Sequence, residues 1–440
     1  MTTGGWGKRH AAFLIGAAAS LGNFIGAAGV EAQTPPQSLS VEGSVRFELD
    51  VDDNSGLRET SPGTDTKVST ILGLDANLET PLQTFSLSLD ADLQYEDRAA
   101  GREEQGFQNP VARLVYRLRG ADSELGFSGT FRTDDFVDSL FIDTDGDEET
   151  DSALTSDGTV DRLNLRADYS FGLTAPFGAD FFVSRDERNF QDVVNPDRFD
   201  RETDTYGITG RFRINPATTG RLIFREERFS AEDAVQTDRD TTDYGVGLDY
   251  TFRPDLRFSG EVTQTEIDEE TTGGNTERDG ISAELGVFRD VSNGSFGIVA
   301  SRTQSTNTAR SDIEFTRNIT VPQGSFSFGV GVSSSDTGDT ALIGSIDYAN
   351  VVPSGVITAT LSRTAEVNDS NNEVQRTRLG LGYSYDINRI SGIAFDLDVV
   401  DLRDIGAGDA TDSTRADFSV TYRRQITEDW DWRIGYQGRY

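Results

Sequence analysis

Residues 85–95, with the sequence FSLSLDADLQY, decide the fold of this chain. Apolar and polar side chains alternate along the stretch with a period of two, which is typical of a β-strand with two chemically different faces. One face is formed by Phe85, Leu87, Leu89, Ala91, Leu93 and Tyr95, and the other by Ser86, Ser88, Asp90, Asp92 and Gln94. The stretch therefore predicts a long strand that is apolar on one side and polar on the other.

The same alternation recurs along the whole chain. Clear examples lie at residues 45–51, 163–171, 206–214, 244–252, 379–387 and 430–440. Twenty-one stretches qualify as candidate strands, and no window shows helical periodicity of comparable strength. Because single-chain bacterial barrels have even strand numbers, we predict an all-β chain of about 20 strands, in a range of 18 to 22.

The connections between these stretches alternate in length. The short ones lie at 79–83, 120–123, 173–176, 215–219, 254–255, 290–293, 322–323, 350–354, 388–390 and 426–428. The long ones are acidic and lie at 52–65, 96–108, 134–158, 187–202, 230–241, 268–276, 365–375 and 403–412, with shorter members near 304–308 and 335–338. Short and long connections that alternate in this way predict a transmembrane antiparallel up-and-down meander β-barrel, whose apolar faces point outward.

A soluble β-sandwich or β-solenoid is the alternative, because two sheets can cover each other's apolar faces. The strand number and the rhythm of the connections disfavour it, as do aromatic residues at strand ends, which suit membrane interfaces. Examples are Tyr95, Tyr116, Phe131, Phe171, Phe177, Tyr206, Phe252 and Phe258.

The first 32 residues predict a secretory signal peptide, since Lys8 and Arg9 precede a small-residue apolar stretch at 11–28. An N-terminal membrane anchor is the alternative. Residues 33–40 then form a short lead, and 41–440 form a single barrel domain. A lead of this length leaves no room for a plug domain, so we expect an open, passive channel rather than an energised receptor.

The composition argues against an enzyme. The chain has no cysteine, and its only histidine, His10, lies in the predicted signal peptide. The mature protein therefore lacks the residues for Ser-His-Asp or Cys-His catalysis and for the usual zinc, copper or haem sites. Carboxylate chemistry, as in glycoside hydrolysis, is what remains, but no pair stands out among 75 acidic residues.

Residues 422–430, YRRQITEDW, followed by Gly435 and Tyr436, resemble Gram-negative outer-membrane β-barrel proteins, and specifically the beta-barrel porin type 2 group. The resemblance to such barrels covers 41–440 and implies export, insertion by the barrel assembly machinery, and a place in the outer membrane among lipid and lipopolysaccharide. Gly435, Tyr436 and Tyr440 match the C-terminal assembly signal of such barrels. Gly438 departs from it, where an apolar residue is expected. With an odd strand count, this suggests one misassigned strand or another strand beyond Tyr440.

The faces opposite the apolar ones carry many arginines along the predicted fourth to ninth strands. This candidate basic arc of the lumen comprises Arg113, Arg117, Arg119, Arg132, Arg162, Arg166, Arg211, Arg213, Arg221 and Arg225. A compositional origin is the alternative, because inward positions must be polar and nearly every basic residue of the chain is arginine.

The longest connection, 134–158, is strongly acidic. Its carboxylates Asp143, Asp145, Asp147 and Asp151 are spaced like those of calcium loops, which predicts a divalent-cation site with Ca²⁺ as the ligand. A solvated acidic surface loop is the alternative. By analogy with trimeric porins, this third long loop can also fold into the lumen.

Taken together, the sequence predicts an outer-membrane channel for passive passage of small polar or anionic solutes. Two alternatives stay open: a pore for exopolysaccharide export, and a structural surface barrel whose loops carry the function. Nucleic acid is excluded as a partner, because a chain with a net charge of −35 repels phosphate.

Overall fold

The computed structural model describes residues 38–53, 63–97, 103–135, 158–192, 199–306, 308–336, 340–367, 373–405, 412–427 and 431–439. The predicted signal peptide, the predicted cation loop with Asp143, Asp145, Asp147 and Asp151, and Tyr440 lie outside these ranges. In the described ranges no helix is long and apolar enough to cross a membrane.

The described residues form 21 strands. They are β1 (Ser38–Asp53), β2 (Thr64–Glu79), β3 (Gln83–Asp97), β4 (Glu103–Arg119), β5 (Ser123–Asp135), β6 (Thr159–Phe171), β7 (Phe177–Gln191), β8 (Arg201–Asn215), β9 (Thr218–Ala231), β10 (Thr237–Arg253), β11 (Leu256–Thr271), β12 (Gly274–Val291), β13 (Gly294–Gln304), β14 (Ala309–Val321), β15 (Gly324–Ser335), β16 (Thr340–Val352), β17 (Gly355–Val367), β18 (Glu373–Asn388), β19 (Ser391–Asp404), β20 (Ser413–Gln425) and β21 (Asp431–Arg439). The number lies inside the predicted range.

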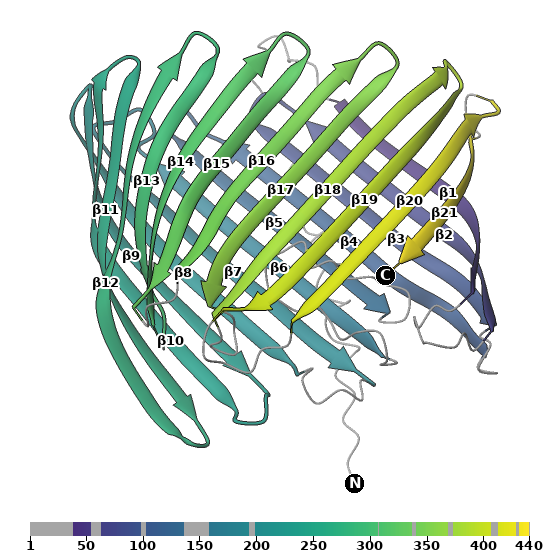
Figure 1. Cartoon of the computed structure of the whole chain (residues 1–440), viewed down its shortest axis with the longest axis horizontal. Coiled ribbons are helices and arrows are strands. Elements are labelled where there is room, and N and C mark those ends of the chain that lie inside the picture. The colour runs from purple at the N-terminus through teal and green to yellow at the C-terminus, as the bar shows by residue number, and fades with distance from the viewer. Residues whose placement is uncertain are drawn as a thin grey trace, which may run out of the picture.

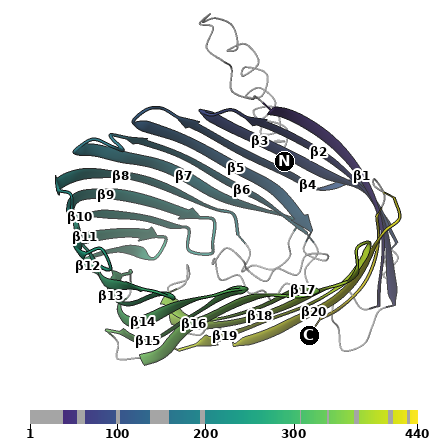
Figure 2. The ribbon, with the colours of Figure 1, turned by 90° about the horizontal axis from the view of Figure 1, so that it is seen from above.

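All the strands belong to one antiparallel meander, in which each strand pairs with the next along the chain. The sheet curves round until β1 and β21 approach each other, as two perpendicular views show (Figures 1 and 2). No ladder joins β1 to β21 among the described residues. A single curved sheet rules out the β-sandwich, because the described strands form no second sheet that could cover the apolar faces.

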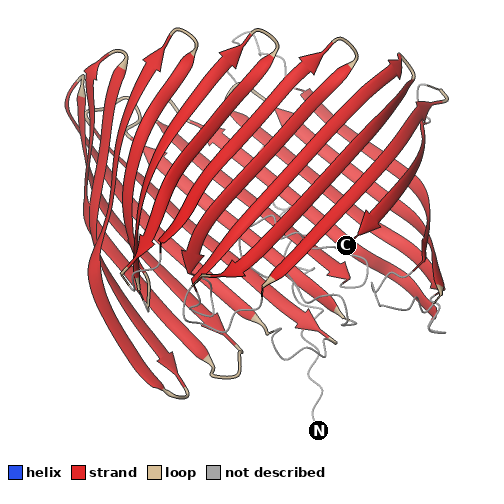
Figure 3. Ribbon diagram, in the orientation of Figure 1, coloured by secondary structure: helices blue, strands red, loops and turns tan. Residues whose placement is uncertain are grey.

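Short turns lie along one edge of the sheet, here called the turn edge, at the top of Figure 3. Nine of the ten predicted short connections are confirmed there, and the tenth, 426–428, extends beyond the described ranges. The turn at Asn293 and Gly294 shows why glycine is needed: Gly294 has a φ of +134°. A Cβ atom at Gly294 would lie 2.0 Å from the backbone oxygen of Asn318 on the next strand.

The opposite edge, here called the loop edge, differs from the prediction because several strands run further than expected. The predicted loop 268–276 is wrong: β11 and β12 are paired as far as Thr271 and Gly274, which leaves a two-residue turn. The predicted loop 230–241 likewise shortens to 232–236. The reason is that these strand ends are polar on both faces, so their alternation cannot be recognised in the sequence.

The β9–β10 and β11–β12 hairpins project furthest at the loop edge, at the lower left of Figure 1. At the other end of the chain, β1 begins at Ser38, inside the predicted lead of residues 33–40.

The outer face of the sheet is apolar and exposed. Val246, Ile313 and Ile346 have 57%, 56% and 39% of their surface exposed, although each lies away from the ends of its strand. The opposite face is polar and concave, since side chains two strands apart meet on it: Arg221 of β9 lies 3.3 Å from Glu261 of β11. This inside-out distribution is the one a lipid-facing barrel requires.

Candidate functional site

All ten arginines of the predicted arc lie on the concave face, here called the inner face. The register explains this placement. On β4, Leu114 pairs with Leu87 of the apolar face, so its neighbour Arg113, opposite Ser88, points to the other side. The same counting across β5, β6, β8 and β9 places the remaining members inward.

The ten arginines do not form one uniform basic surface, because carboxylates accompany many of them. Arg211 of β8 is paired with Asp180 of β7. Arg221 of β9 lies 3.1 Å from Asp249 of β10 and 3.3 Å from Glu261 of β11. The charge toward the turn edge is therefore largely compensated.

Carboxylates also lie close to arginines of the arc on β4 and β6. Arg117 and Arg119 share the carboxylate of Glu124, at 3.0 and 3.1 Å. Arg166 lies 2.6 Å from Asp168. Arg113, in contrast, forms no ion pair with any residue that the structure describes.

Four arginines form a continuous row across the inner face, here called the arginine row. Arg132 of β5 pairs in register with Arg162 of β6, Arg162 with Arg188 of β7, and Arg188 with Arg201 of β8. Three of them are buried, with exposed fractions of 5% for Arg162, 4% for Arg188 and 9% for Arg201.

Sequence reasoning found only half of the arginine row. It included Arg132 and Arg162 in the arc but assigned Arg188 and Arg201 to the predicted loop 187–202, which instead contains the ends of β7 and β8. The missing signal was alternation on the polar face: Arg188 is two residues from Asp186 and four from Ser184, which both face inward.

Like charges at this spacing repel each other. Neighbouring strands lie about 5 Å apart, where two unit charges repel by about 3 kcal/mol at the effective dielectric of a protein surface. Two carboxylates offset part of this cost: Asp134 lies 2.9 Å from Arg132, and Asp186 lies 3.7 Å from Arg188. The row concentrates four guanidinium groups on one part of the inner face.

The tip of the β17–β18 hairpin leaves the wall and folds over the inner face. Ladder pairing between β16 and β17 ends at Gly344 and Arg363, whereas β17 and β18 stay paired as far as Val367 and Glu373. The detached tip reaches back to β16, where the side-chain amide of Gln375 donates to the backbone oxygen of Leu342 at 3.2 Å.

A buried ion pair holds this tip in place. Arg310, an inner-face residue of β14, donates to Glu373 of β18 at 3.1 Å and to the hydroxyl of Ser333 at 2.9 Å. The side chains of Arg310 and Glu373 are only 6% and 9% exposed. The contact spans four strands, which places the tip inside the curve of the sheet.

A second tip folds inward at the β13–β14 turn. The hydroxyl of Thr306 donates to Glu269 of β11 at 3.4 Å, and Arg278 of β12 donates to the backbone oxygen of Thr306 at 3.4 Å. Glu269 also lies 3.5 Å from Arg239 of β10. The two tips together narrow the space inside the sheet on the wall opposite the arginine row.

Gly435 and Tyr436, two of the three predicted C-terminal assembly residues, lie on β21, the short last strand. Gly435 pairs with Thr421, and Tyr436, with 69% of its surface exposed, pairs with Val420 on the outer face. In the part of the chain that the structure describes, no group of three or more acidic or histidine side chains is arranged to hold a metal ion.

Comparison with known proteins gives structural matches alone. No family model matches the chain, and no curated protein matches its sequence. The FrpB iron transporter from Neisseria meningitidis aligns at 8% identity over 86% of this chain and 80% of its own, with a TM-score of 0.54.

Two further structures give similar values. The ferric-catecholate import receptor Fiu from E. coli K12 aligns at 10% identity over 92% of this chain and 77% of its own, with a TM-score of 0.56. The copper transporter OprC aligns at 10% identity over 92% and 74%, with a TM-score of 0.50. All three are named as transporters or receptors, not as enzymes. At these identities the likeness shows the fold, and this chain has the fold of the outer-membrane β-barrels that carry out transport.

Proposed function

We propose that this protein is an outer-membrane channel through which small polar solutes, and anions in preference to cations, pass by diffusion. The observation that carries the proposal is the arginine row of Arg132, Arg162, Arg188 and Arg201 on the inner face of β5–β8. A row of guanidinium groups beside low-dielectric wall attracts anions, because the surrounding protein focuses its field.

The rest of the inner face supports selectivity at the arginine row. Several other inner-face arginines are dispersed and paired with carboxylates of neighbouring strands, as Arg211 is with Asp180 and Arg221 is with Asp249 and Glu261. Many carboxylates lie in the connections, ten of them in 134–158 alone, but salt screens exposed charges beyond about 8 Å at physiological ionic strength. The row therefore has more influence on a solute inside the channel than the loops have.

We further propose that β1 and β21 close the barrel. Both are odd-numbered strands of a meander, so they run in the same direction and their pairing would be parallel. Their chemistry suits such a pair. On the outer face Phe47 and Trp432 are both apolar, and on the inner face Glu42 and Glu48 would approach Arg433.

The test of function is reversal-potential measurement on single channels in planar bilayers, under a salt gradient. The wild type is expected to prefer chloride over potassium. The variant Arg162→Gln/Arg188→Gln should lower this preference by about twofold or more, because the local positive potential falls. Restoring the charge as Arg162→Lys/Arg188→Lys should recover most of it.

The matched control is Arg185→Gln/Arg228→Gln, which removes the same charge from the outer face of β7 and β9. Its selectivity should equal that of the wild type. A cation-selective wild type, or equal effects of the inner and outer double variants, would contradict the assignment. A folded protein that never conducts would instead support the alternative of a surface barrel.

Several predictions from sequence extend this proposal without a structural test. They are the absence of a plug, insertion by the barrel assembly machinery, contact with lipopolysaccharide, the Ca²⁺ loop, and the likeness to the beta-barrel porin type 2 group. Export of an exopolysaccharide would use the same anion-attracting wall. It differs in requiring a passage wide enough for a polymer.

A further inference from the structure

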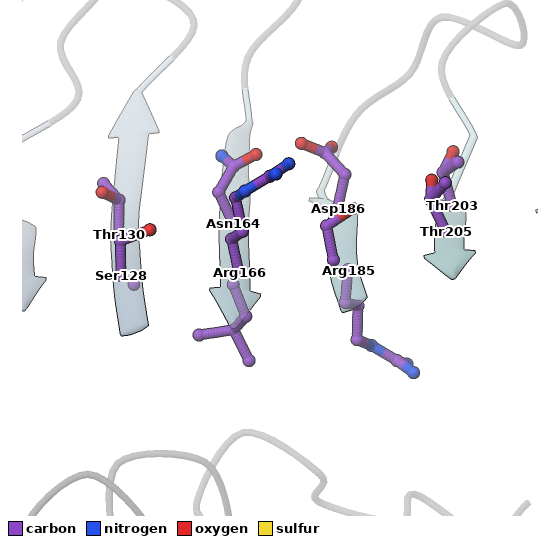
Figure 4. Close-up of a pocket in the computed structure, with 11 residues that line it drawn as sticks. Ser128, Thr130, Asn164, Arg166, Arg185, Asp186, Thr203 and Thr205 are labelled. Carbon is purple, nitrogen blue, oxygen red and sulfur yellow. The ribbon is translucent and has the colours of Figure 1, made fainter. Parts of the chain in front are cut away.

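A cavity of about 350 Å³ lies on the inner face of β5–β8, beside the arginine row. Its volume is within the range of small-molecule sites, about 300–1,000 Å³. Two register rows form its floor: Ser128 and Ser184 belong to one, and Thr130, Asn164 and Thr203 belong to the other. Figure 4 shows that Asn164 and Asp186 extend to one side of the sheet and the Arg185 side chain to the other.

The floor of the cavity is rich in neutral hydrogen-bonding groups. Five hydroxyls and one amide line it, from Ser128, Thr130, Asn164, Ser184, Thr203 and Thr205. None of these six side chains hydrogen-bonds to any residue in the described ranges. All six are half-buried or exposed. Each can donate and accept, so together they match the hydroxyls of a sugar.

Charge lies within this floor, where the side chain of Arg166 lines the cavity, and at one border of it. On each strand the arginine row lies two residues from the cavity: Arg162 from Asn164, and Arg188 from Asp186. Two residues along a strand span about 7 Å, close to the length of one sugar ring with its substituents. Asp186 also lines the cavity and can accept hydrogen bonds from ligand hydroxyls.

We propose that this cavity is a binding site for a monomeric hydroxylated organic anion, of the sugar-acid class. The carboxylate would lie against Arg166, which lines the cavity, and the hydroxyls against the neutral groups of the floor. A positive charge by itself would bind any small anion. The hydroxyls of the floor, which have no hydrogen-bond partner among the described residues, favour an anion that also carries hydroxyl groups. This inference rests on the proposed passage of anions and names their chemical class.

Binding can be measured apart from conduction. Saturation-transfer difference NMR on the folded full chain in detergent micelles, with galacturonate as the probe, reports binding whether or not the channel conducts. Galacturonate should bind at least several-fold more tightly than galactose, which lacks the charge, and than propionate, which lacks the hydroxyls. The variant Thr130→Val/Thr203→Val/Thr205→Val should weaken galacturonate binding by about tenfold or more, since each hydrogen bond contributes on the order of a few-fold.

The matched control is Thr316→Val/Thr358→Val/Thr360→Val, which removes three inner-face hydroxyls from the opposite wall and should leave binding unchanged. Heat-modifiable mobility on gels shows whether each variant is folded. If the β5–β8 variant unfolds, Ser128→Ala/Ser184→Ala serves in its place with the same expected direction. Equal affinities for galacturonate and propionate, or no loss of affinity in the folded variant, would overturn the sugar-acid site. Neither result would contradict the proposed anion selectivity, because that selectivity is tested separately by the reversal potential.

Discussion

Single residues on the inner face show two ways of placing a cation in a barrel wall. Arg211 and Arg221 each lie against carboxylates of neighbouring strands, so their ion pairs link adjacent strands of the sheet. The members of the arginine row also have the carboxylate neighbours Asp134 and Asp186, but in addition they lie side by side on four successive strands, at a cost in repulsion and desolvation. We interpret the first arrangement as structural and the second as functional.

At the turn edge, Asp122 ties two neighbouring turns together. Its carboxylate accepts hydrogen bonds from the backbone nitrogen of Thr174 at 2.6 Å and from the hydroxyl of Thr174 at 2.7 Å. These bonds, with the backbone bond first in importance, lower the pKa of Asp122 below its ordinary value of 3.8.

The lowered pKa of Asp122 gives a pH prediction. A depressed carboxyl pKa means that the tie stabilises the fold at all pH values above the ordinary pKa and is lost as the pH falls through the lowered value. Amide hydrogen exchange at Thr174 should therefore stay protected at pH 5 and lose protection only in stronger acid. Asp122→Ala should remove this pH dependence. Loss of protection already near pH 5 in the wild type would contradict the prediction.

Among the structural elements, the β17–β18 hairpin is the clearest candidate for a movable constriction. Its tip is detached from β16 and held by the buried pair of Arg310 and Glu373. Removing one partner of a buried pair costs about 3–5 kcal/mol, because the other charge is left without compensation. Glu373→Gln should therefore release the tip, raise single-channel conductance and speed amide exchange over 373–377.

Asp336→Asn is the control for this hairpin. Asp336 and Arg302 form an ion pair near the same edge at 2.8 Å, but their side chains are 47% and 40% exposed. Exposed pairs contribute about 0–1 kcal/mol, so this variant should leave conductance and exchange unchanged. Similar behaviour of the two variants would show that the tip does not depend on the buried pair.

For the whole molecule, the orientation in the membrane follows from the two edges. We expect the turn edge to face the periplasm and the loop edge to face the outside, as is usual for outer-membrane barrels. Single cysteines at Asp238 and at Asp145 should react with an impermeant reagent on intact cells, whereas one at Ala217 should not. Labelling of Ala217 alone would invert the orientation.

Closure of the barrel has its own test. A cysteine at Ser44 of β1, combined in turn with cysteines at Arg433, Gly435 and Gln437 of β21, should give a disulfide for at least one pair, because all four positions face inward. Ser44→Cys combined with Ser325→Cys, on the opposite wall, is the control and should give none. Failure of every β1–β21 pair would leave the sheet open.

The sequence alone determined the class of fold and, away from the polar strand ends, the face on which a side chain lies. Alternation with a period of two is a local property of the strand backbone, so it can be recognised without knowing any neighbour. It placed all ten predicted arginines correctly on the inner face. The nine short connections within the described ranges were equally predictable, because tight turns depend on a few adjacent residues such as Asn293 and Gly294.

Only the tertiary structure decided which inward residues meet. The row from Arg132 to Arg201 depends on the offsets of three successive hairpins, and an offset of two residues would leave every face unchanged while moving each arginine to another level. The contact between Arg310 and Glu373 depends on a hairpin that leaves the sheet, which no pattern along β17 or β18 indicates. Alternation encodes the direction of a side chain, whereas register and curvature, which bring distant strands together, arise from the packing of the whole sheet.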